Sequence, residues 1–250
     1  MILAIAGSKG GTGKTTLSVH LAGWLHQHGW ATVLVDCDLQ QLSSKWLERA
    51  MPEIPFERLH SPEEVVSRLQ HLAEEFEVVV VDGPGDLSET TGAILAVADA
   101  CLLPTAPSKL DIDGLSWTIQ TIQEIQKTRE DNKPDAIIVP VKASENFKAT
   151  RYLYDMAPRF GFGITPDALP YRQVYIHVAG LQGPPRLLWQ LGRSQQVRVA
   201  ALEMDKLFRG AFPEACEEDP QLIYRMVTPP KKQTVQQQMR SNEVEYRKAI

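Results

Sequence analysis

The chain has 250 residues, with 26 Lys and Arg against 31 Asp and Glu and a formal net charge of −5. This length suits one sizeable domain, and the negative balance argues mildly against a dedicated nucleic-acid binder. From Arg186 to the C-terminus, however, there are 11 basic residues and 8 acidic ones, which permits a local basic face that binds DNA. We expect no signal peptide and no membrane span, because the apolar runs are too short. Three widely spaced cysteines, Cys37, Cys101 and Cys216, predict reduced thiols of a cytosolic protein.

A glycine-rich loop follows the first apolar run, 2–6, and precedes a segment with helical spacing, 17–28. Glycines permit a backbone path in which successive N–H groups converge on phosphate oxygens, and the next helix adds its positive end. We predict that Lys14 reaches the β- and γ-phosphates and that the Thr15 hydroxyl holds Mg²⁺. The alternative is a glycine-rich turn with a capping threonine. The loop, with Gly7 before it, reads Ser8-Lys9-Gly10-Gly11-Thr12-Gly13-Lys14-Thr15-Thr16.

Apolar runs and helical periodicities alternate along the rest of the chain. We predict further strands at 31–35, 77–82, 99–104 and 136–141, and helices at 41–49, 61–76, 88–97, 112–129 and 145–159. Such alternation predicts an α/β fold: a P-loop, doubly wound, mostly parallel sheet with helices on both faces.

Three aspartates follow predicted strands, where parallel sheets bind their ligands. Asp36 and Asp38 follow the strand at 31–35, and their spacing points them to opposite sides, so they should have different roles. The alternative is that both cap the helix at 41–49. Asp82 ends a run of four valines and is predicted beside the metal, accepting a hydrogen bond from a metal-bound water. The glycine-containing segment 83–88 suits a loop that rearranges with the nucleotide.

Lys9 is a second lysine that an ordinary phosphate loop does not need. The pattern Lys-Gly-Gly-x-Gly-Lys-Thr-Thr resembles the deviant Walker A motif of the ParA/MinD family of ATPases. The resemblance implies that Lys9 crosses a dimer interface to the partner's ATP, that Lys14 acts in its own subunit, and that Asp38 orients the attacking water. It also implies that Asp36 lies near the metal shell. Without the resemblance, Lys9 is merely a cation near a polyanion.

Three later segments extend the resemblance. Pro107-Ser108-Lys109-Leu110-Asp111 resembles the interface segment of short ParF-like ParA proteins, with Lys109 in place of a second proline. The stretch 169–175 resembles the loop that closes over adenine, which makes Arg172 a nucleotide contact; its composition alone describes only a loop. Basic residues of a helix predicted at 193–209 are implied to contact DNA, and a solvated helix face is the alternative.

The resemblance divides the chain into a ParA-like ATPase domain, 1–220, and a polar helical extension, 221–250, which lacks the basic-apolar character of a membrane-targeting helix. It implies an ATPase (ATP and water to ADP and phosphate) with slow intrinsic turnover, using ATP/ADP and Mg²⁺. The implied partners are a second copy of the chain, non-specific DNA and a ParB-like or cargo-adaptor protein that stimulates hydrolysis. The implied setting is cytoplasmic and nucleoid-associated, with no membrane.

The implied output is partition of plasmid or chromosomal DNA, or positioning of another cargo over the nucleoid. A MinD-like positioning ATPase that does not act on DNA and a metabolic P-loop enzyme remain as alternatives. An electron-donating ATPase resembling the nitrogenase iron protein is disfavoured, because the three cysteines are badly placed for a cluster.

Overall fold

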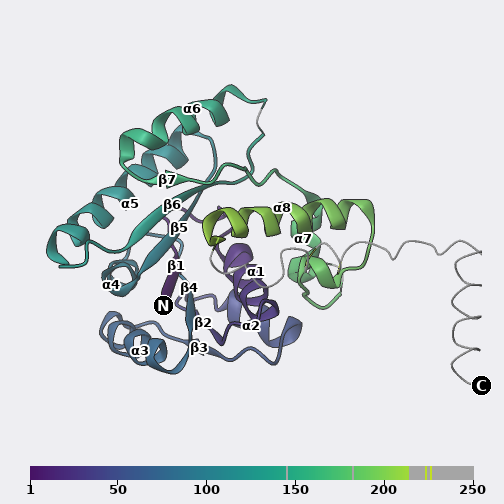
Figure 1. Cartoon of the computed structure of the whole chain (residues 1–250), viewed down its shortest axis with the longest axis horizontal. Coiled ribbons are helices and arrows are strands. Elements are labelled where there is room, and N and C mark those ends of the chain that lie inside the picture. Colours follow the sequence, from purple (N-terminus) through teal and green to yellow (C-terminus); the bar gives the residue numbers. More distant parts are fainter. Residues whose placement is uncertain (145, 182, 214–222, 224–225, 227–250) are drawn as a thin grey trace, which may run out of the picture.

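A computed structural model describes residues 1–144, 146–181, 183–213, 223 and 226. Seven strands form one sheet in the order β3-β2-β4-β1-β5-β6-β7 (Figure 1). Every strand pairing is parallel, so the predicted fold class is confirmed. The strands are β1 (Ile2–Ile5), β2 (Thr32–Asp36), β3 (Phe56–Arg58), β4 (Val78–Asp82), β5 (Ala100–Thr105), β6 (Asp135–Pro140) and β7 (Gly163–Ile164).

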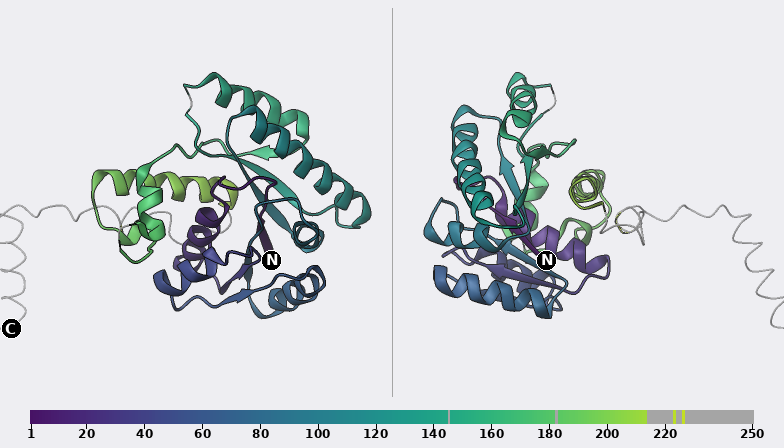
Figure 2. Two further views of the ribbon diagram at one scale, coloured as in Figure 1. Left: turned by 180° about the vertical axis from the view of Figure 1, so that it is seen from behind. Right: turned by 60° about the vertical axis from the view of Figure 1, so that its left-hand side comes forward.

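Helices cover both faces of this sheet (Figure 2). One face packs against α1 (Lys14–Gln27), α2 (Leu42–Ala50), α7 (Gln173–Ile176) and α8 (Gln195–Ala211). The other packs against α3 (Pro62–Glu75), α4 (Glu89–Val97), α5 (Lys109–Thr128) and α6 (Lys148–Met156). The alternation of strand β1 explains this division: Leu3 and Ile5 enter the first core, whereas Ile2 and Ala4 enter the second.

Most predicted elements are confirmed to within a few residues, and the differences have local causes. Helix α5 begins at Lys109 rather than 112, because the Ser108 hydroxyl accepts a hydrogen bond from the Asp111 N–H at 3.2 Å and so caps the helix earlier. Helix α6 spans Lys148–Met156, shorter than the predicted 145–159, and continues as a 3₁₀ turn. Strand β7, only two residues long, was not predicted. Part of the predicted loop at 169–175 is the short helix α7.

The extension predicted at 221–250 lies outside the described residues apart from 223 and 226. Ile223 is buried in the core that contains α1 and α8. Across the described part of the chain, no helix has both the length and the hydropathy that crossing a bilayer requires.

His20 is a fully buried, neutral linker between α1 and the segment at 187–190. Its Nδ1 lies 2.7 Å from the Thr16 carbonyl, and its Nε2 accepts a hydrogen bond from the Leu188 N–H at 3.2 Å. The ring lies between the indoles of Trp46 and Trp189, with edge-to-face geometry and 5.6 Å between centroids in each pair. Burial lowers the pKa of His20 to about 4, because an imidazolium would lose its hydration there.

Acidification should therefore destabilise the protein through His20. The unfolded chain binds this proton at its ordinary pKa of about 6.5, so the stabilisation is complete above that pH and is lost as pH falls towards 4. The slope is about 1.4 kcal/mol per pH unit in this window. Urea unfolding at pH 6.5 and 5 should show wild type losing about 2 kcal/mol more than His20→Gln, which cannot titrate. Equal losses in the two proteins would assign the acid sensitivity to other groups.

Candidate functional site

A cavity of about 590 Å³ opens at the carboxyl edge of the sheet, between the glycine-rich loop and α7. Loop residues Gly10 to Thr16 line one side of it. The volume falls within the range of small-molecule sites, and a polar end beside an apolar end suits a ligand with a phosphate chain and a flat ring. The apolar side is formed by Val141, Leu169, Pro170, Tyr171, Ile176 and Met204.

Lys14 stands at the start of α1, directly after Gly13, whose φ of +89° favours glycine. Only 6% of Lys14 is exposed, and its Nζ donates to the Lys9 carbonyl at 2.9 Å. Burial lowers the pKa of Lys14, and the nearby charges of Asp82, Asp38 and Asp86 oppose that shift. The ammonium thus donates to a carbonyl of its own loop, and a phosphate oxygen can replace that partner.

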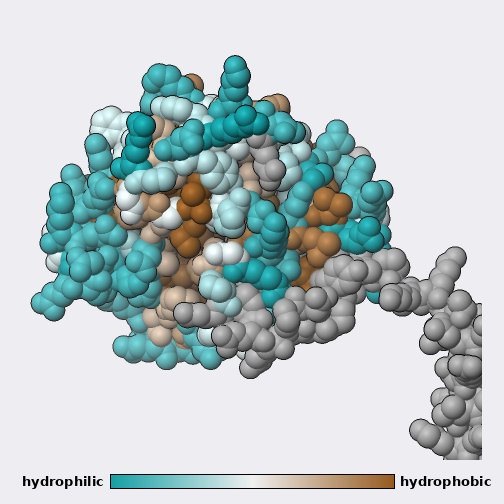
Figure 3. Space-filling view, turned by 45° about the horizontal axis from the view of Figure 1, so that its top comes forward, coloured by the Kyte–Doolittle hydropathy of each residue, from teal (hydrophilic) through white to brown (hydrophobic). Residues whose placement is uncertain are grey.

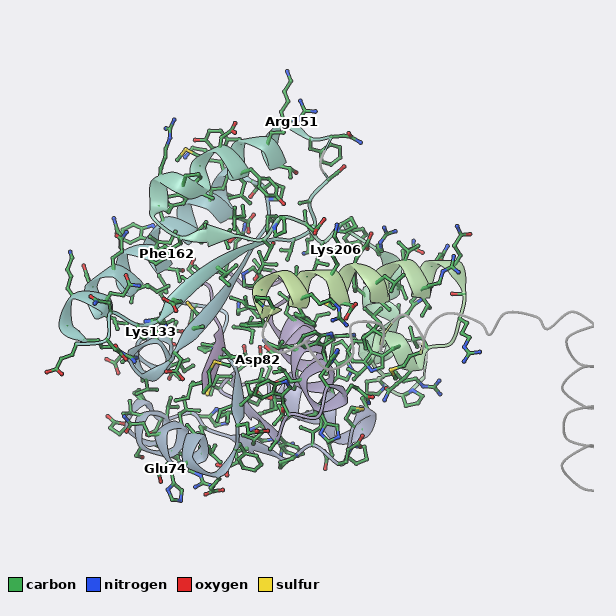
Figure 4. All side chains as sticks on the ribbon, in the orientation of Figure 1. Glu74, Asp82, Lys133, Arg151, Phe162 and Lys206 are labelled. Carbon is green, nitrogen blue, oxygen red and sulfur yellow. The ribbon has the colours of Figure 1, made fainter. Side chains whose placement is uncertain are left out.

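Asp82 lies at the centre of the molecule, at the end of β4 (Figure 4). Its Oδ2 accepts from the Thr15 hydroxyl at 3.0 Å, and its Oδ1 accepts from the Ser18 hydroxyl at 2.8 Å. Its pKa is raised to about 7, chiefly by burial and also by the nearby charge of Asp36, while the hydrogen bonds from Ser18 and Thr15 oppose the shift. A carboxylate and a hydroxyl are oxygen donors that suit Mg²⁺. Residues Thr15 and Asp82 therefore fit the predicted metal site.

Groups of three or more His, Cys, Asp or Glu with metal-binding geometry are absent from the described residues. A site with few protein ligands matches Mg²⁺, which keeps several waters and shares phosphate oxygens of its nucleotide. Ser18 was not among the predicted residues. Its spacing of three from Thr15 puts both hydroxyls on one helix face, so the sequence contained a signal for it.

The two aspartates after β2 have different surroundings. Asp36 is fully buried, and its carboxylate accepts from the N–H groups of Ser44, at 2.8 Å, and Asp38, at 3.2 Å. The capping alternative thus describes Asp36, which holds the first turn of α2, although it also lies close enough to Asp82 to raise that pKa. Asp38 is half-buried and accepts from the Gln40 N–H at 2.8 Å.

A second cavity, of about 420 Å³, lies between the loops that follow β2 and β4. Asp38, Gln40 and Gly85 line both cavities. A Cβ on Gly83 would lie 3.0 Å from the Ile5 carbonyl, which explains the glycine directly after Asp82.

Lys9 is paired within its own subunit. Its Nζ lies 3.0 Å from Asp111 Oδ2, and 43% of the Lys9 side chain remains exposed. Helix α5 is pressed against the loop beside it, because a Cβ on Gly114 would come within 2.5 Å of the Ser8 hydroxyl. The segment 107–111 therefore touches the glycine-rich loop through the contact of Asp111 with Lys9. Lys109, which replaces a proline of the resembled pattern, pairs with Asp113 at 2.8 Å.

Arg172 lies in the wall of the first cavity, next to Tyr171 and Tyr175. Its guanidinium is held by Glu203 of α8 through two hydrogen bonds, one of them 2.6 Å long from Nε. Contact between Arg172 and a nucleotide stays a prediction. The ion pair with Glu203 either orients the Arg172 side chain for that contact or must open before the contact can form.

The helix predicted at 193–209 carries four basic residues, Arg193, Arg198, Lys206 and Arg209, and two of them have acidic partners. Lys206 pairs with Asp167 at 2.7 Å, and Arg209 pairs with Asp205 at 3.0 Å. Figure 4 shows Lys206 on α8, away from the central Asp82. Arg193 is exposed just before this helix, and Arg198 is half-buried on it.

Lys142 is a contact that the sequence did not predict. It follows β6 and donates from Nζ to the Gly11 carbonyl at 2.7 Å, a contact between positions 131 residues apart. Nothing near it in sequence resembles a motif, and only the parallel pairing of β5 with β6 brings its strand to the loop.

Comparisons with known proteins agree with this geometry. The model of the "CobQ/CobB/MinD/ParA nucleotide binding domain" family matches residues 3–173. The chain is 30% identical to a protein of Halothiobacillus neapolitanus named "Maintenance of carboxysome distribution protein A", over 84% of this chain and 96% of that protein. It is 27% identical to the "Chromosome-partitioning ATPase Soj" of Thermus thermophilus, over 50% of this chain and 62% of the relative.

Solved structures show the same fold. The apo structure of McdA from Cyanothece matches with a TM-score of 0.64 at 18% identity, over 86% of this chain and 98% of that one. MinD of Aquifex aeolicus matches with a TM-score of 0.62 at 15% identity, over 83% and 95%. On the strength of the family model and the Halothiobacillus relative, the chain belongs to the CobQ/CobB/MinD/ParA family of nucleotide-binding domains, a family that includes the ParA and MinD ATPases.

Proposed function

We propose that the chain is an ATP-driven dimerisation switch that binds DNA without sequence preference and positions a cargo over the nucleoid. The observation that carries the proposal is the unequal placement of the two loop lysines. Lys14 is buried in its own loop, whereas Lys9 is half-exposed at the loop's edge, where its ammonium pairs with Asp111. A lysine so placed can turn towards the phosphates of a second subunit.

In this proposal ATP binds with its phosphates on residues 9–16 and its base against the apolar side of the cavity, beside Arg172. The Thr15 hydroxyl would hold Mg²⁺ and Asp82 would accept a hydrogen bond from a water on the ion, which would neutralise charge on the phosphates. Lys9 of each subunit completes the other's site, and Asp38 orients the attacking water. Turnover of a lone subunit is slow because the site is incomplete, and a ParB-like or cargo-adaptor protein accelerates it. Hydrolysis to ADP and phosphate then dissolves the dimer.

The DNA part of the proposal is supported by the basic balance of the C-terminal region and by relatives named for chromosome partitioning. Lys206 and Arg209 have acidic partners. We therefore expect Arg186, Arg193 and Arg198 to make the main contacts with DNA phosphates. A relative named for carboxysome distribution supports a cargo other than DNA equally well. On the face seen in Figure 3, hydrophobic side chains of the described residues form separate patches among hydrophilic ones.

Sedimentation velocity of the wild-type protein tests the switch. With ADP and Mg²⁺ we expect a monomer, and with ATP and Mg²⁺ a dimer that also carries a random-sequence DNA duplex. Phosphate contacts dominate such binding, so affinity for the duplex should fall by at least about tenfold between 50 and 200 mM salt.

Three other outcomes would change the assignment. An ATP-dependent dimer that ignores DNA would favour a MinD-like positioning ATPase. A monomer that binds ATP would overturn the sandwich dimer and favour a metabolic enzyme. Failure of both nucleotides to bind, tested with Lys14→Ala as the reference for an inactive loop, would overturn the nucleotide site itself.

A further inference from the structure

Lys142 is a third lysine at the phosphate loop, and it reaches the loop from β6 rather than from the loop itself. Its ammonium donates to the Gly11 carbonyl at 2.7 Å, and both residues line the larger cavity. We propose that Lys142 is a positioning residue, which fixes the peptide between Gly11 and Thr12 in the orientation that a bound phosphate requires. The inference rests on the proposed nucleotide binding and adds a residue outside the loop motif to that site.

The backbone around Lys142 is held firmly in an uncommon conformation. Lys142 has a φ of +52°, in the left-handed region that side-chain-bearing residues seldom adopt. Both neighbours are tethered, since the Val141 N–H donates to the Thr105 carbonyl at 3.0 Å and the Ala143 N–H donates to the Leu169 carbonyl at 3.2 Å. Strained residues held by their surroundings cluster at functional sites. Here the conformation points a lysine at the loop.

The geometry of a peptide gives that contact a consequence for binding. In a planar trans peptide the carbonyl and the next N–H point in opposite directions. Because Lys142 holds the Gly11 carbonyl, the Thr12 N–H is directed away from Lys142, as a donor available to an anion. Gly11 itself has a φ of +76° and no side chain, so this peptide has little local restraint of its own.

Without that hold, the peptide can rotate and present its carbonyl oxygen to the phosphates, which both repels the anion and removes a donor. Thr12 is already restrained on its other side, because its hydroxyl donates to the Lys9 carbonyl at 3.3 Å. Lys14 holds that same Lys9 carbonyl at 2.9 Å. The two ammonium groups therefore hold alternate carbonyls of the loop, and Lys142 can keep its hold while Lys14 moves to a phosphate.

Three substitutions at position 142, studied in the full chain, test the inference with ADP as the probe. Lys142→Met keeps length but removes the donor, and calorimetry should show ADP binding weakened by about tenfold, the effect of losing one charge-assisted hydrogen bond. Lys142→Arg keeps a cationic donor and should restore most of the affinity. Lys142→Gly removes the donor but relieves the left-handed backbone, so ADP affinity should fall while the unfolding midpoint stays at or above that of wild type.

Lys127→Met, at an exposed lysine near the end of α5, is the matched control for the change in charge and should bind ADP like wild type. Hydrogen exchange of the nucleotide-free protein should also be faster at residues 10–13 in Lys142→Met than in wild type. Normal ADP affinity in both Lys142→Met and Lys142→Gly would overturn the positioning role and leave the proposed function intact. If the wild-type protein fails to bind ADP, both the positioning role of Lys142 and the proposed function are overturned. A loss equal to that of Lys127→Met would assign the effect to net charge and overturn the role.

Discussion

Lys9→Ala should abolish ATP-dependent dimerisation while leaving each monomer able to bind ADP. In a two-fold symmetric dimer the change removes two crossing contacts at once. Each is a charge-assisted contact with a phosphate, worth about 1.5–3 kcal/mol, so the dimer should weaken by about two to four orders of magnitude. Sedimentation with ATP and Mg²⁺ measures the loss, and calorimetry with ADP shows that the loop still binds, because Lys14 and the loop N–H groups remain.

Two further variants separate this role from a general effect of charge. Asp111→Asn removes the partner that holds Lys9 in its own subunit. Two such pairs open per dimer, each worth up to about 1 kcal/mol, so the dimer should become tighter by up to about 30-fold. Lys127→Ala removes a positive charge far from the loop and should dimerise normally. If Lys9→Ala still forms the ATP dimer, Lys9 is an ordinary cation beside the nucleotide and the crossing model is wrong.

Local signals carried most of what the sequence revealed. The glycine-rich loop, the helix after it and the valine-rich strand that ends at Asp82 are each encoded within about ten residues. The structure confirms the positions of the helix and the strand. The parallel sheet follows from strand-helix alternation, because parallel neighbours require crossover connections. The alternative that Asp36 and Asp38 cap the next helix was also visible, because aspartate is a preferred residue before a helix, and Asp36 accepts from the Ser44 N–H of α2.

Contacts between distant segments were not predictable in the same way. No local pattern marks Lys142, whose partner lies 131 residues away. The Lys9–Asp111 pair depends on how closely α5 approaches the loop, and that distance is set by Gly114 packing against Ser8. The hold of Glu203 on Arg172 depends on the packing of α8, which one sequence does not specify. The loop and the carboxylates could thus be placed from predicted secondary structure alone. The ion pairs that restrain the side chains of the site could be identified only from the tertiary structure.

Asp38→Ala should stop hydrolysis and leave ATP binding and dimerisation in place. Asp38 lines both cavities and is half-buried. In the proposed site it accepts a hydrogen bond from the water that attacks the terminal phosphate. Loss of a group that positions or activates the nucleophile lowers turnover by about 100-fold or more. The ATP dimer should therefore persist, and single-turnover phosphate release measures the defect.

Asp38→Asn is the informative companion to that variant. Its amide oxygen can still accept from the Gln40 N–H, the bond that Asp38 Oδ1 makes at 2.8 Å, so the loop after β2 keeps its shape. Its other terminus is now a donor and cannot accept a proton or a hydrogen bond from the attacking water. Turnover in Asp38→Asn should fall as far as in Asp38→Ala, whereas Asp155→Ala, at an exposed aspartate of α6, should match wild type. Normal turnover in Asp38→Asn would mean that Asp38 serves only to form the turn, and that a different group orients the water.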